Sequence, residues 1–447
     1  MRHRRRRSWT ALALVTVLLA GTGLSGCSAD EPTGEVTVLA SWTGAERAAF
    51  DAVLRGFEAE TGIHVDYQGH RDVSQVLQAG IERGRPPDIA VLPRLNDVQR
   101  YVNEGQLRPL DEIVEGDAGA AAQVIRLARK TQPVGLQRAY AVAVATHLKS
   151  IFWYEPSALA AVGHRQPPAT WAELVAQSRD VAAGGRVPWC LGMSSPPVSG
   201  WPGTDWIEDI LLHQSGQAAY ERWTRGELSW RTGPVRDAWV AWGDLLGVSS
   251  SPGTARASLF TTWADAGSGL LTAPPGCYLD HQASFVLRTY RDAMPDGGGP
   301  VDFFPTPPVG PSDTSSLQEV SDDIAALFRD TGPARKLMAY LASEPAQRIW
   351  RESSDELFFS RRARSGDYAD PVVARVARRL GTGTLCRDGS DLLPTAVATA
   401  FERAVLVYLQ DPGRLDALLA ELDAVRGSVP PAEYMNLGCE PAAPPTN

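Results

Sequence analysis

The fold is decided by a stretch of sequence that begins with Val36-Thr37-Val38-Leu39-Ala40. This β-branched run predicts a strand, and the apolar residues at helical spacing after it predict a helix to about Glu60. Residues 63–67 and 88–92 predict two more strands, with a helix over residues 73–83 between them. Strand, helix, strand, helix, strand in this order predicts a parallel sheet with helices on its faces, and therefore an α/β fold.

Two candidate ligand-binding residues lie beside these strands. In open parallel sheets, ligands bind outside the carboxyl ends of the strands. Trp42 follows the first strand in a polar turn, so it is either a stacking platform for a ligand or a core aromatic packed over the first helix. Asp88 ends the turn Arg85-Pro86-Pro87-Asp88 before the third strand, where capping of the turn is the alternative to a ligand role.

Length and composition narrow the class of protein. The chain has 447 residues, which exceeds one typical domain and predicts two or three. Hydrophobic residues make up 44% and charged residues 21%, so wholesale disorder is excluded. A formal net charge of −9 argues against a nucleic-acid partner, which would require a basic surface.

The N-terminus has the features of an export signal with a lipid-attachment site. An arginine-rich start precedes the apolar run 11–20, which is too short to span a bilayer of about 30 Å. Leu24-Ser25-Gly26-Cys27 resembles a bacterial lipobox. We therefore expect a signal peptide over residues 1–26, lipidation of Cys27 and a polar tether over residues 27–34. The alternative is an ordinary signal peptide with a chance cysteine.

Four cysteines remain after Cys27, and an even number in an oxidising compartment predicts two disulfides. Three connectivities are open for these four residues. Zinc binding is the alternative, but the chain has no CxxC pair and no His-Cys cluster, and no D-x-D-x-D-G loop indicates calcium. We expect neither a metal nor a cofactor. The cysteines are Cys190, Cys277, Cys386 and Cys439.

The middle of the chain is aromatic and helical. Ten of the 13 tryptophans lie between Trp153 and Trp263. Helices are predicted over residues 171–183, 205–215, 217–225, 234–246, 333–343, 394–409 and 415–425. Strand-like runs cover 140–145 and 276–287, residues 324–328 are apolar and precede the helix over 333–343, and a loop rich in Gly, Pro and Ser covers 296–316.

Several segments in the same order resemble extracellular solute-binding proteins, family 1, of ABC sugar importers, and within it the alpha-glucoside-binding branch. They cover nearly the whole chain after Cys27. The block Glu319-Val320-Ser321-Asp322-Asp323 departs from the resemblance, because relatives often carry a glycine-rich turn there. The segments are Lys149-Ser150-Ile151-Phe152-Trp153-Tyr154, Trp189-Cys190-Leu191-Gly192, Gly200-Trp201-Pro202-Gly203-Thr204-Asp205-Trp206, Pro275-Gly276-Cys277-Tyr278 and Asp388-Gly389-Ser390-Asp391-Leu392-Leu393-Pro394.

The resemblance implies a two-lobed, type II periplasmic-binding-protein-like α/β fold with a ligand cleft between the lobes. It favours, together with sequence order, the disulfides Cys190–Cys277 and Cys386–Cys439. The chain is then expected to cross between lobes near residues 146–150, 280–286 and 357–361. The implied division is an N-lobe of residues 35–147 and 283–358, a C-lobe of residues 148–282 and 359–440, and a tail of residues 441–447.

Sugars are bound by aromatic faces over the ring and by charged groups that hydrogen-bond to hydroxyls. Trp201, Asp205 and Trp206 are the most suggestive group, with an N-cap role for Asp205 and a core position for Trp206 as alternatives. Lys149 stands beside the first expected crossing, where a hinge salt bridge is the alternative. The further candidates are Trp153, which alternates with Tyr154 so that one of them belongs to the core, Trp263, Gln282 near Phe285, and Asp391, for which helix capping is the alternative.

The sequence therefore predicts a monomeric sugar receptor, lipid-anchored at the outer face of the cell membrane. It would capture an oligosaccharide, an alpha-glucoside by resemblance, and pass it to the transmembrane subunits of an ABC permease without chemistry. The enzyme signatures GxSxG with a partner His, HExxH and the P-loop are absent from the sequence. Two alternatives remain, a secreted glycoside hydrolase and a non-transport sugar sensor or scaffold lipoprotein.

Overall fold

The computed structural model describes residues 34–114, 123–131, 136–249, 252–294, 301–355, 357–362 and 364–442. The described chain from Gly34 onward forms one compact unit. The expected signal peptide, the lipidation site Cys27, the tether up to residue 33 and the tail from residue 443 lie outside the described residues.

The predicted parallel sheet is present. Strand β1 (Glu35–Ala40) lies between β2 (His64–Gly69) and β3 (Ile89–Leu92), and both neighbours run parallel to it. Helices α1 (Gly44–Thr61) and α2 (Val73–Glu82) connect the strands as the sequence predicts.

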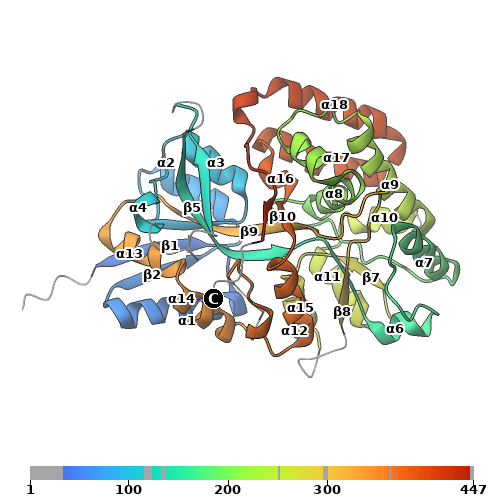
Figure 1. Ribbon diagram of the computed structural model, residues 1–447, viewed down its shortest axis with the longest axis horizontal. Helices are drawn as coiled ribbons and strands as arrows, with labels where there is room; N and C mark the ends of the chain where they lie inside the picture. Colours follow the sequence, from blue (N-terminus) through green and yellow to red (C-terminus); the bar gives the residue numbers. More distant parts are fainter. Residues whose placement is uncertain are drawn as a thin grey trace, which may run out of the picture. The chain divides into compact units, whose positions relative to one another are not determined.

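Alternate side chains of these strands enter two separate cores. Val36 and Val38 pack with α1, α13 (Gly332–Leu341) and α14 (Glu344–Ser353). Leu39 points to the other face and packs with α2 and α3 (Leu95–Asn103). The helices therefore cover both faces of the sheet, as Figure 1 shows. This arrangement follows from the period of two in a strand that is buried on both faces.

Strand β9 (Leu317–Leu327) pairs with three strands of this sheet. It runs antiparallel to β3 and to β5 (Gln137–Leu148), and parallel to β10 (Thr384–Arg387). Strands β4 (Val124–Ala128) and β11 (Glu440–Pro441) extend the sheet from β5 and β10.

A second sheet has three antiparallel strands, β6 (Ile151–Tyr154), β7 (Leu279–His281) and β8 (Asp302–Pro305). The prediction of a loop over residues 296–316 is wrong at β8. Both aromatic residues of this strand are buried. The ring of Phe304 stacks on that of Phe152 with centroids 5.3 Å apart, and the ring of Phe303 packs against that of Trp153 with centroids 5.4 Å apart. Burial of these two rings outweighs the turn-forming residues around them.

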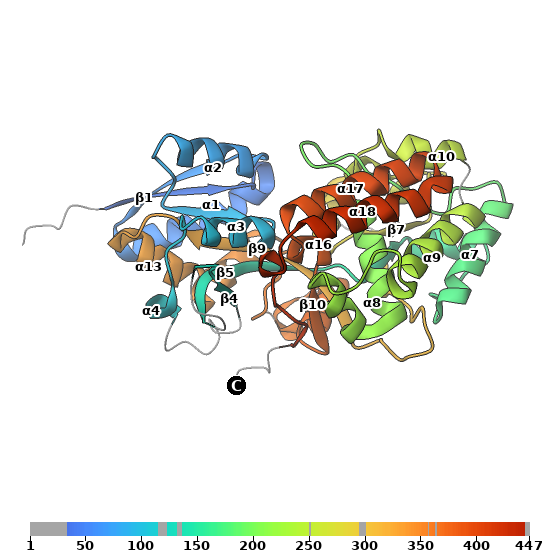
Figure 2. The same cartoon turned by 90° about the horizontal axis from the view of Figure 1, so that it is seen from above.

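Helices α8 (Trp201–Thr224), α9 (Gly233–Ser249), α17 (Thr395–Gln410) and α18 (Leu415–Ser428) surround a core rich in tryptophan, and α17 and α18 lie side by side in Figure 2. The two helices predicted over 205–225 are joined in α8 with a break at Gly216, whose φ is 76°. The remaining helices are α4 (Asp111–Val114), α6 (Pro156–Ala161), α7 (Trp171–Ala183), α10 (Pro252–Ser258), α11 (Trp263–Ser268), α12 (Val286–Asp292), α15 (Pro371–Leu380) and α16 (Gly389–Leu392).

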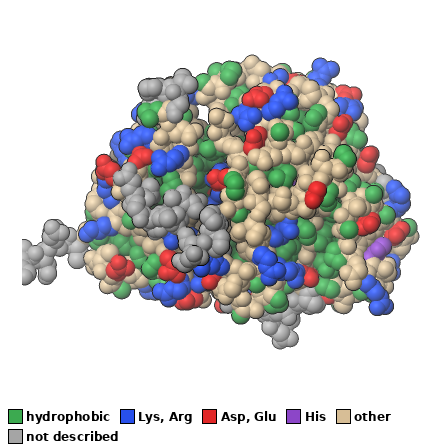
Figure 3. Space-filling model, in the orientation of Figure 1, with side chains coloured by type: hydrophobic (Ala, Val, Ile, Leu, Met, Phe, Trp, Pro, Cys, Tyr) green, Lys and Arg blue, Asp and Glu red, His purple; other side chains and the backbone are tan. Residues whose placement is uncertain are grey.

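Both expected disulfides are present. Cys190 pairs with Cys277 and Cys386 pairs with Cys439, with Cα atoms 5.2 and 4.1 Å apart. The second disulfide joins β10 to the residue just before β11. Among the described residues, no helix combines the length and the apolar character that a bilayer crossing requires. Acidic and basic side chains are interspersed on the face drawn in Figure 3.

Candidate ligand-binding site

A buried lysine organises the polar part of the site. Lys149 directly follows β5, and its backbone N–H donates to the carbonyl of Glu319 at 2.8 Å. Its Nζ donates to Asp205 Oδ1 at 2.9 Å and to Asp388 Oδ2. Burial opposes the charge on Lys149, but Asp205 and Asp388 outweigh burial and raise the pKa of Lys149 well above its ordinary value. The ammonium therefore stays charged inside the protein.

The two carboxylates on Lys149 are held by helix starts. Asp205 lies in the first turns of α8, which begins after Gly200. Gly200 has a φ of 101°, and a Cβ there would lie 2.5 Å from the carbonyl oxygen of Glu402, so only glycine fits this approach. Asp388 is the N-cap of α16 and accepts from the Asp391 N–H at 3.0 Å. Asp205 is not an N-cap, because α8 begins four residues earlier than predicted.

Both acids are buried, but their hydrogen-bond partners give them different pKa values. Burial raises the pKa of Asp205 to about 6, against the lowering effect of Lys149. The pKa of Asp388 is lowered to about 2, because Lys149 and the hydroxyl of Ser390 together outweigh its burial. Asp388 therefore carries the firmer negative charge of the two.

An aromatic wall lies beside this ion pair. It consists of Trp201, Trp263 and Phe285, all partly exposed, with ring centroids 5.3 to 6.2 Å apart. Lys149 Nζ lies 5.8 Å from the Trp201 ring centroid. Flat apolar faces therefore stand next to charged hydrogen-bonding groups.

A second ion pair joins the residue that follows β3 by two positions, Arg94, to helices α16 and α17. Arg94 donates to Glu402 Oε1 at 2.6 Å and lies 3.9 Å from Asp391 Oδ1. Asn96 Nδ2 donates to the carbonyl of Ser390 at 3.1 Å. Arg94 was not predicted from the sequence, although its position just past the carboxyl end of a buried strand is where parallel sheets bind ligands.

The structure thus brings five of the predicted residues close to one another, directly or through their neighbours. They are Lys149, Trp201, Asp205, Trp263 and Asp391. Asp391 is partly buried, and its pKa is raised well above the ordinary value by burial and by Asp388. Gln282 is 5% exposed and its Oε1 has no hydrogen-bond partner in the described protein. It stands three residues before Phe285 of the aromatic wall.

Three predicted tryptophans lie in the hydrophobic cores instead. Trp42 packs between Phe50 and Trp350, with ring centroids 4.7 and 4.8 Å away. Trp206 is 3% exposed and its ring lies 4.5 Å from that of His281. Trp153 has no exposed surface. For each of them the core alternative describes the observed packing, since a ligand would have to displace core side chains to reach the ring.

Asp88 also has a structural environment. Its Oδ2 accepts from the backbone N–H and from the hydroxyl of Thr37, both at 2.9 Å. These bonds tie β3 to β1 at the amino end of β3. Asp88 therefore lies at the edge of the sheet opposite to the edge where parallel sheets bind ligands.

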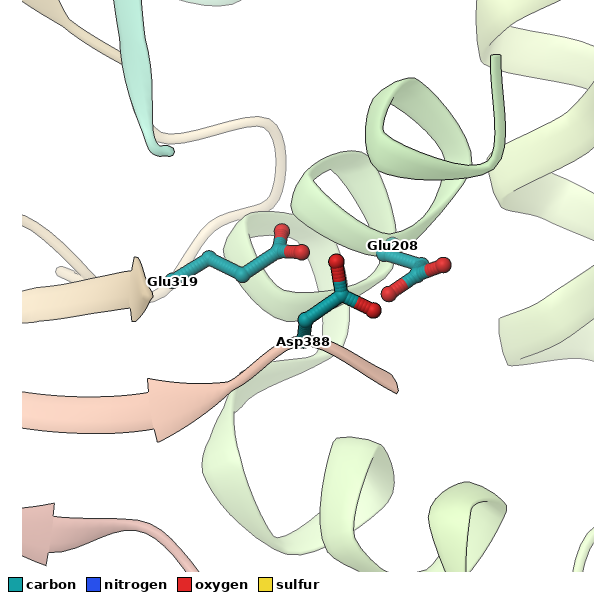
Figure 4. Close-up of side chains that lie close together, drawn as sticks. All are labelled: Glu208, Glu319 and Asp388. Atoms are coloured by element: carbon teal, nitrogen blue, oxygen red, sulfur yellow. The ribbon is translucent and has the colours of Figure 1, made fainter. Parts of the chain in front are cut away.

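One further group of acids lies against Asp388. Carboxylate oxygens of Glu208, Glu319 and Asp388 lie within 4.8 Å of one another, and all three residues are buried. Figure 4 shows that the three carboxyl groups converge from α8, β9 and the residue after β10. Such a set could hold a metal ion by its donor atoms, which the sequence did not predict.

A family model described as bacterial extracellular solute-binding protein matches residues 40–348. The osmoprotective compounds-binding protein GgtB of Synechocystis sp. is 31% identical to this chain, in an alignment that covers 87% of this chain and 92% of GgtB. The alpha-glucosides-binding periplasmic protein AglE of Rhizobium meliloti is 30% identical, covering 80% of each chain.

Solved structures share the two-lobed type II fold. The bacterial solute receptor AcbH superposes with a TM-score of 0.72 at 17% identity, covering 88% of this chain and 97% of its own. A chitin oligosaccharide binding protein gives 0.71 at 19% identity, covering 88% and 98%. Because the family model spans more than half of the sequence, the chain belongs to the bacterial extracellular solute-binding proteins.

Proposed function

We propose that the protein is the lipid-anchored substrate-binding component of an ABC importer and captures an oligosaccharide, an alpha-glucoside. The observation that carries this proposal is the aromatic wall of Trp201, Trp263 and Phe285 beside the ion pair of Lys149 and Asp205. A sugar ring presents an apolar C–H face to aromatic rings and hydroxyls to charged groups. A site with both kinds of group side by side suits such a ligand.

The name of one relative supports an alpha-glucoside as the ligand. AglE is named for alpha-glucosides and GgtB for osmoprotective compounds, each at about 30% identity over most of the chain. We therefore assign this chain an alpha-glucoside. In this role the protein acts as a monomer outside the cytoplasm, held at the membrane through Cys27, and delivers the sugar to the permease.

The contacts of the carboxylates support binding without chemistry. Hydrolysis of a glycoside requires one acid and one base or nucleophile that flank the scissile bond. Asp205 and Asp388 instead contact the same ammonium, and Glu402 contacts Arg94. Each of these carboxylates is already held by a cation of the protein, which favours a receptor over a hydrolase.

The test is a titration of the purified protein with a panel of alpha-glucosides while tryptophan fluorescence is followed. We expect saturable binding of at least one member and no free monosaccharide after long incubation. Release of monosaccharide would favour the hydrolase.

In a strain that lacks the gene, we expect uptake of the bound sugar to fall, and unchanged uptake would favour the sensor or scaffold.

A further inference from the structure

Buried carboxyl groups outnumber buried cations behind the ligand-binding residues. Four carboxyl groups adjoin one another there, from Asp205, Glu208, Glu319 and Asp388, and each is at most 3% exposed. In the described part of the chain, Lys149 is the one cation within ion-pair distance of these four groups. A buried charge needs a compensating charge or a proton. Lys149 compensates only one of the four.

Two members of this group have carboxyl oxygens without a hydrogen-bond partner in the described protein. Glu319 has no exposed surface, and neither of its carboxylate oxygens has a hydrogen-bond partner in the described protein. Its carboxyl group points toward Asp388 in Figure 4. Glu208 uses Oε2 to accept from the backbone N–H groups of Gly389 and Ser390, whereas its Oε1 also lacks a partner. One carboxylate oxygen from each of Glu208, Glu319 and Asp388 lies within 4.8 Å of the others.

The backbone holds these groups in place. Glu208 lies on α8, Glu319 on β9, and Asp388 caps α16. The two N–H groups that bind Glu208 Oε2 hold this carboxyl group against the start of α16. Three carboxylates on three rigid elements, with oxygen atoms within 4.8 Å, have the donor type and spacing of a site for a hard divalent cation.

We propose that Glu208, Glu319 and Asp388 bind one divalent cation of the oxygen-preferring class, Ca²⁺, Mg²⁺ or Mn²⁺. One such ion supplies two of the three positive charges that Lys149 leaves missing, a proton on one carboxyl group supplies the third, and the ion gives the unpartnered Glu319 carboxyl group a partner. Asp388 then joins the ion to Lys149 and, through Lys149, to Asp205. The ion lies behind the ligand-binding residues and supports their positions.

The experiment uses the full chain purified from an exporting host and stripped with EDTA. CaCl₂, MgCl₂ and MnCl₂ are titrated separately, without sugar, by calorimetry and by thermal unfolding. We expect at least one ion to bind with a stoichiometry of one and to raise the melting temperature by about 2 °C or more. Because no sugar is present, the result does not depend on the proposed transport role.

Glu319→Gln removes one ligand charge with little change in shape, and we expect ion affinity to fall at least ~10-fold, with Glu208→Gln as a second variant. Asp280→Asn is the matched control, because Asp280 is equally buried but lies outside the acidic group, and it should bind the ion like the wild type. Lack of uptake of all three ions by the wild type would overturn the proposal and leave proton sharing between the carboxyls. Equal uptake by Glu319→Gln and the control would overturn it as well.

Discussion

Lys149 Nζ lies 2.9 Å from Asp205 Oδ1, and both side chains are buried although 56 residues separate them in the sequence. The same ammonium donates to Asp388, 239 residues away. One side chain thus connects the residue after β5, the start of α8 and the cap of α16. The segments that carry the candidate site are fixed to one another through this contact.

Replacement of Lys149 by methionine should destabilise the protein strongly. The variant leaves Asp205 and Asp388 buried without their cation, and removal of one partner from a buried ion pair costs about 3–5 kcal/mol. Urea unfolding at pH 7 measures the loss. Lys130→Met is the control, since the pair of Lys130 and Glu433 is 38% and 39% exposed, and its loss should be below about 1 kcal/mol. Similar losses in the two variants would show that burial of Lys149 does not matter.

Asp280 should make stability fall as the pH rises. Burial raises its pKa to about 7, with the Tyr290 hydroxyl as its partner at 2.7 Å. Between the ordinary value of 3.8 and about 7, the folded chain keeps a proton that the unfolded chain has lost. The stability from this group is therefore fully present below pH 3.8 and is lost as the pH rises to 7.

Asp280→Asn removes this dependence. We expect the free energy of unfolding of the wild type, relative to the variant, to fall by on the order of 1 kcal/mol per unit between pH 5 and pH 7. Urea unfolding at pH 5, 6 and 7 measures it. Asp322→Asn is the control, because Arg361 and Arg387 lower the pKa of Asp322 despite its burial, so its contribution is lost only in acid. A difference between wild type and Asp280→Asn that stays constant with pH would contradict the prediction.

The disulfide between Cys386 and Cys439 should contribute substantially to stability. It closes a separation of 53 residues, for which the chain-entropy relation gives about 4 kcal/mol. We expect Cys439→Ser to lower the unfolding midpoint in urea clearly. Intact-mass analysis after alkylation without reductant should show no modified thiol among the four paired cysteines. Two alkylated thiols would show that one of the two disulfides does not form.

The sequence predicted the parallel strands well because their signals are local. Val36, Val38 and Leu39 alternate between two buried faces, and helices with clear stop signals follow. In β9, by contrast, the polar residues Ser321, Asp322 and Asp323 interrupt the apolar pattern by which a buried strand is predicted. Asp322 is buried there only because Arg361 and Thr146 bind it, at 3.1 and 2.7 Å. Partners so distant in the chain leave no local signal.

The site shows the same limit. Trp42, Trp201 and Trp206 are alike in residue type, and Trp42 and Trp201 both stand near turns, but only Trp201 keeps part of its ring exposed in the aromatic wall. Whether a tryptophan lines a site or fills a core depends on what packs over it. For Trp42 this is Trp350, which is 308 residues away in the sequence.

Lipidation of Cys27 should govern membrane attachment. We expect the exported chain to partition into the detergent phase of Triton X-114, because an acyl-modified cysteine adds apolar surface worth about 0.8 kcal/mol per buried CH₂. Cys27→Ser should move the protein to the aqueous phase and retain its sugar binding. Cys190→Ser, which alters a paired cysteine, should stay with the detergent. Detergent partitioning of Cys27→Ser would contradict lipid attachment at this residue.

Trp201→Ala tests the proposed sugar site most directly. Loss of a ring that stacks on the sugar should weaken alpha-glucoside binding about tenfold or more, which is about 1.4 kcal/mol. The melting temperature should change little, because Trp201 is only partly buried and starts α8 rather than filling its core. Trp171→Ala is matched to it, since Trp171 is also partly buried at a helix start but lies on α7, outside the aromatic wall. Calorimetry should show sugar affinity unchanged in Trp171→Ala and reduced in Trp201→Ala. If the two variants bind equally well, the aromatic wall does not contact the ligand and the binding surface lies elsewhere on the chain.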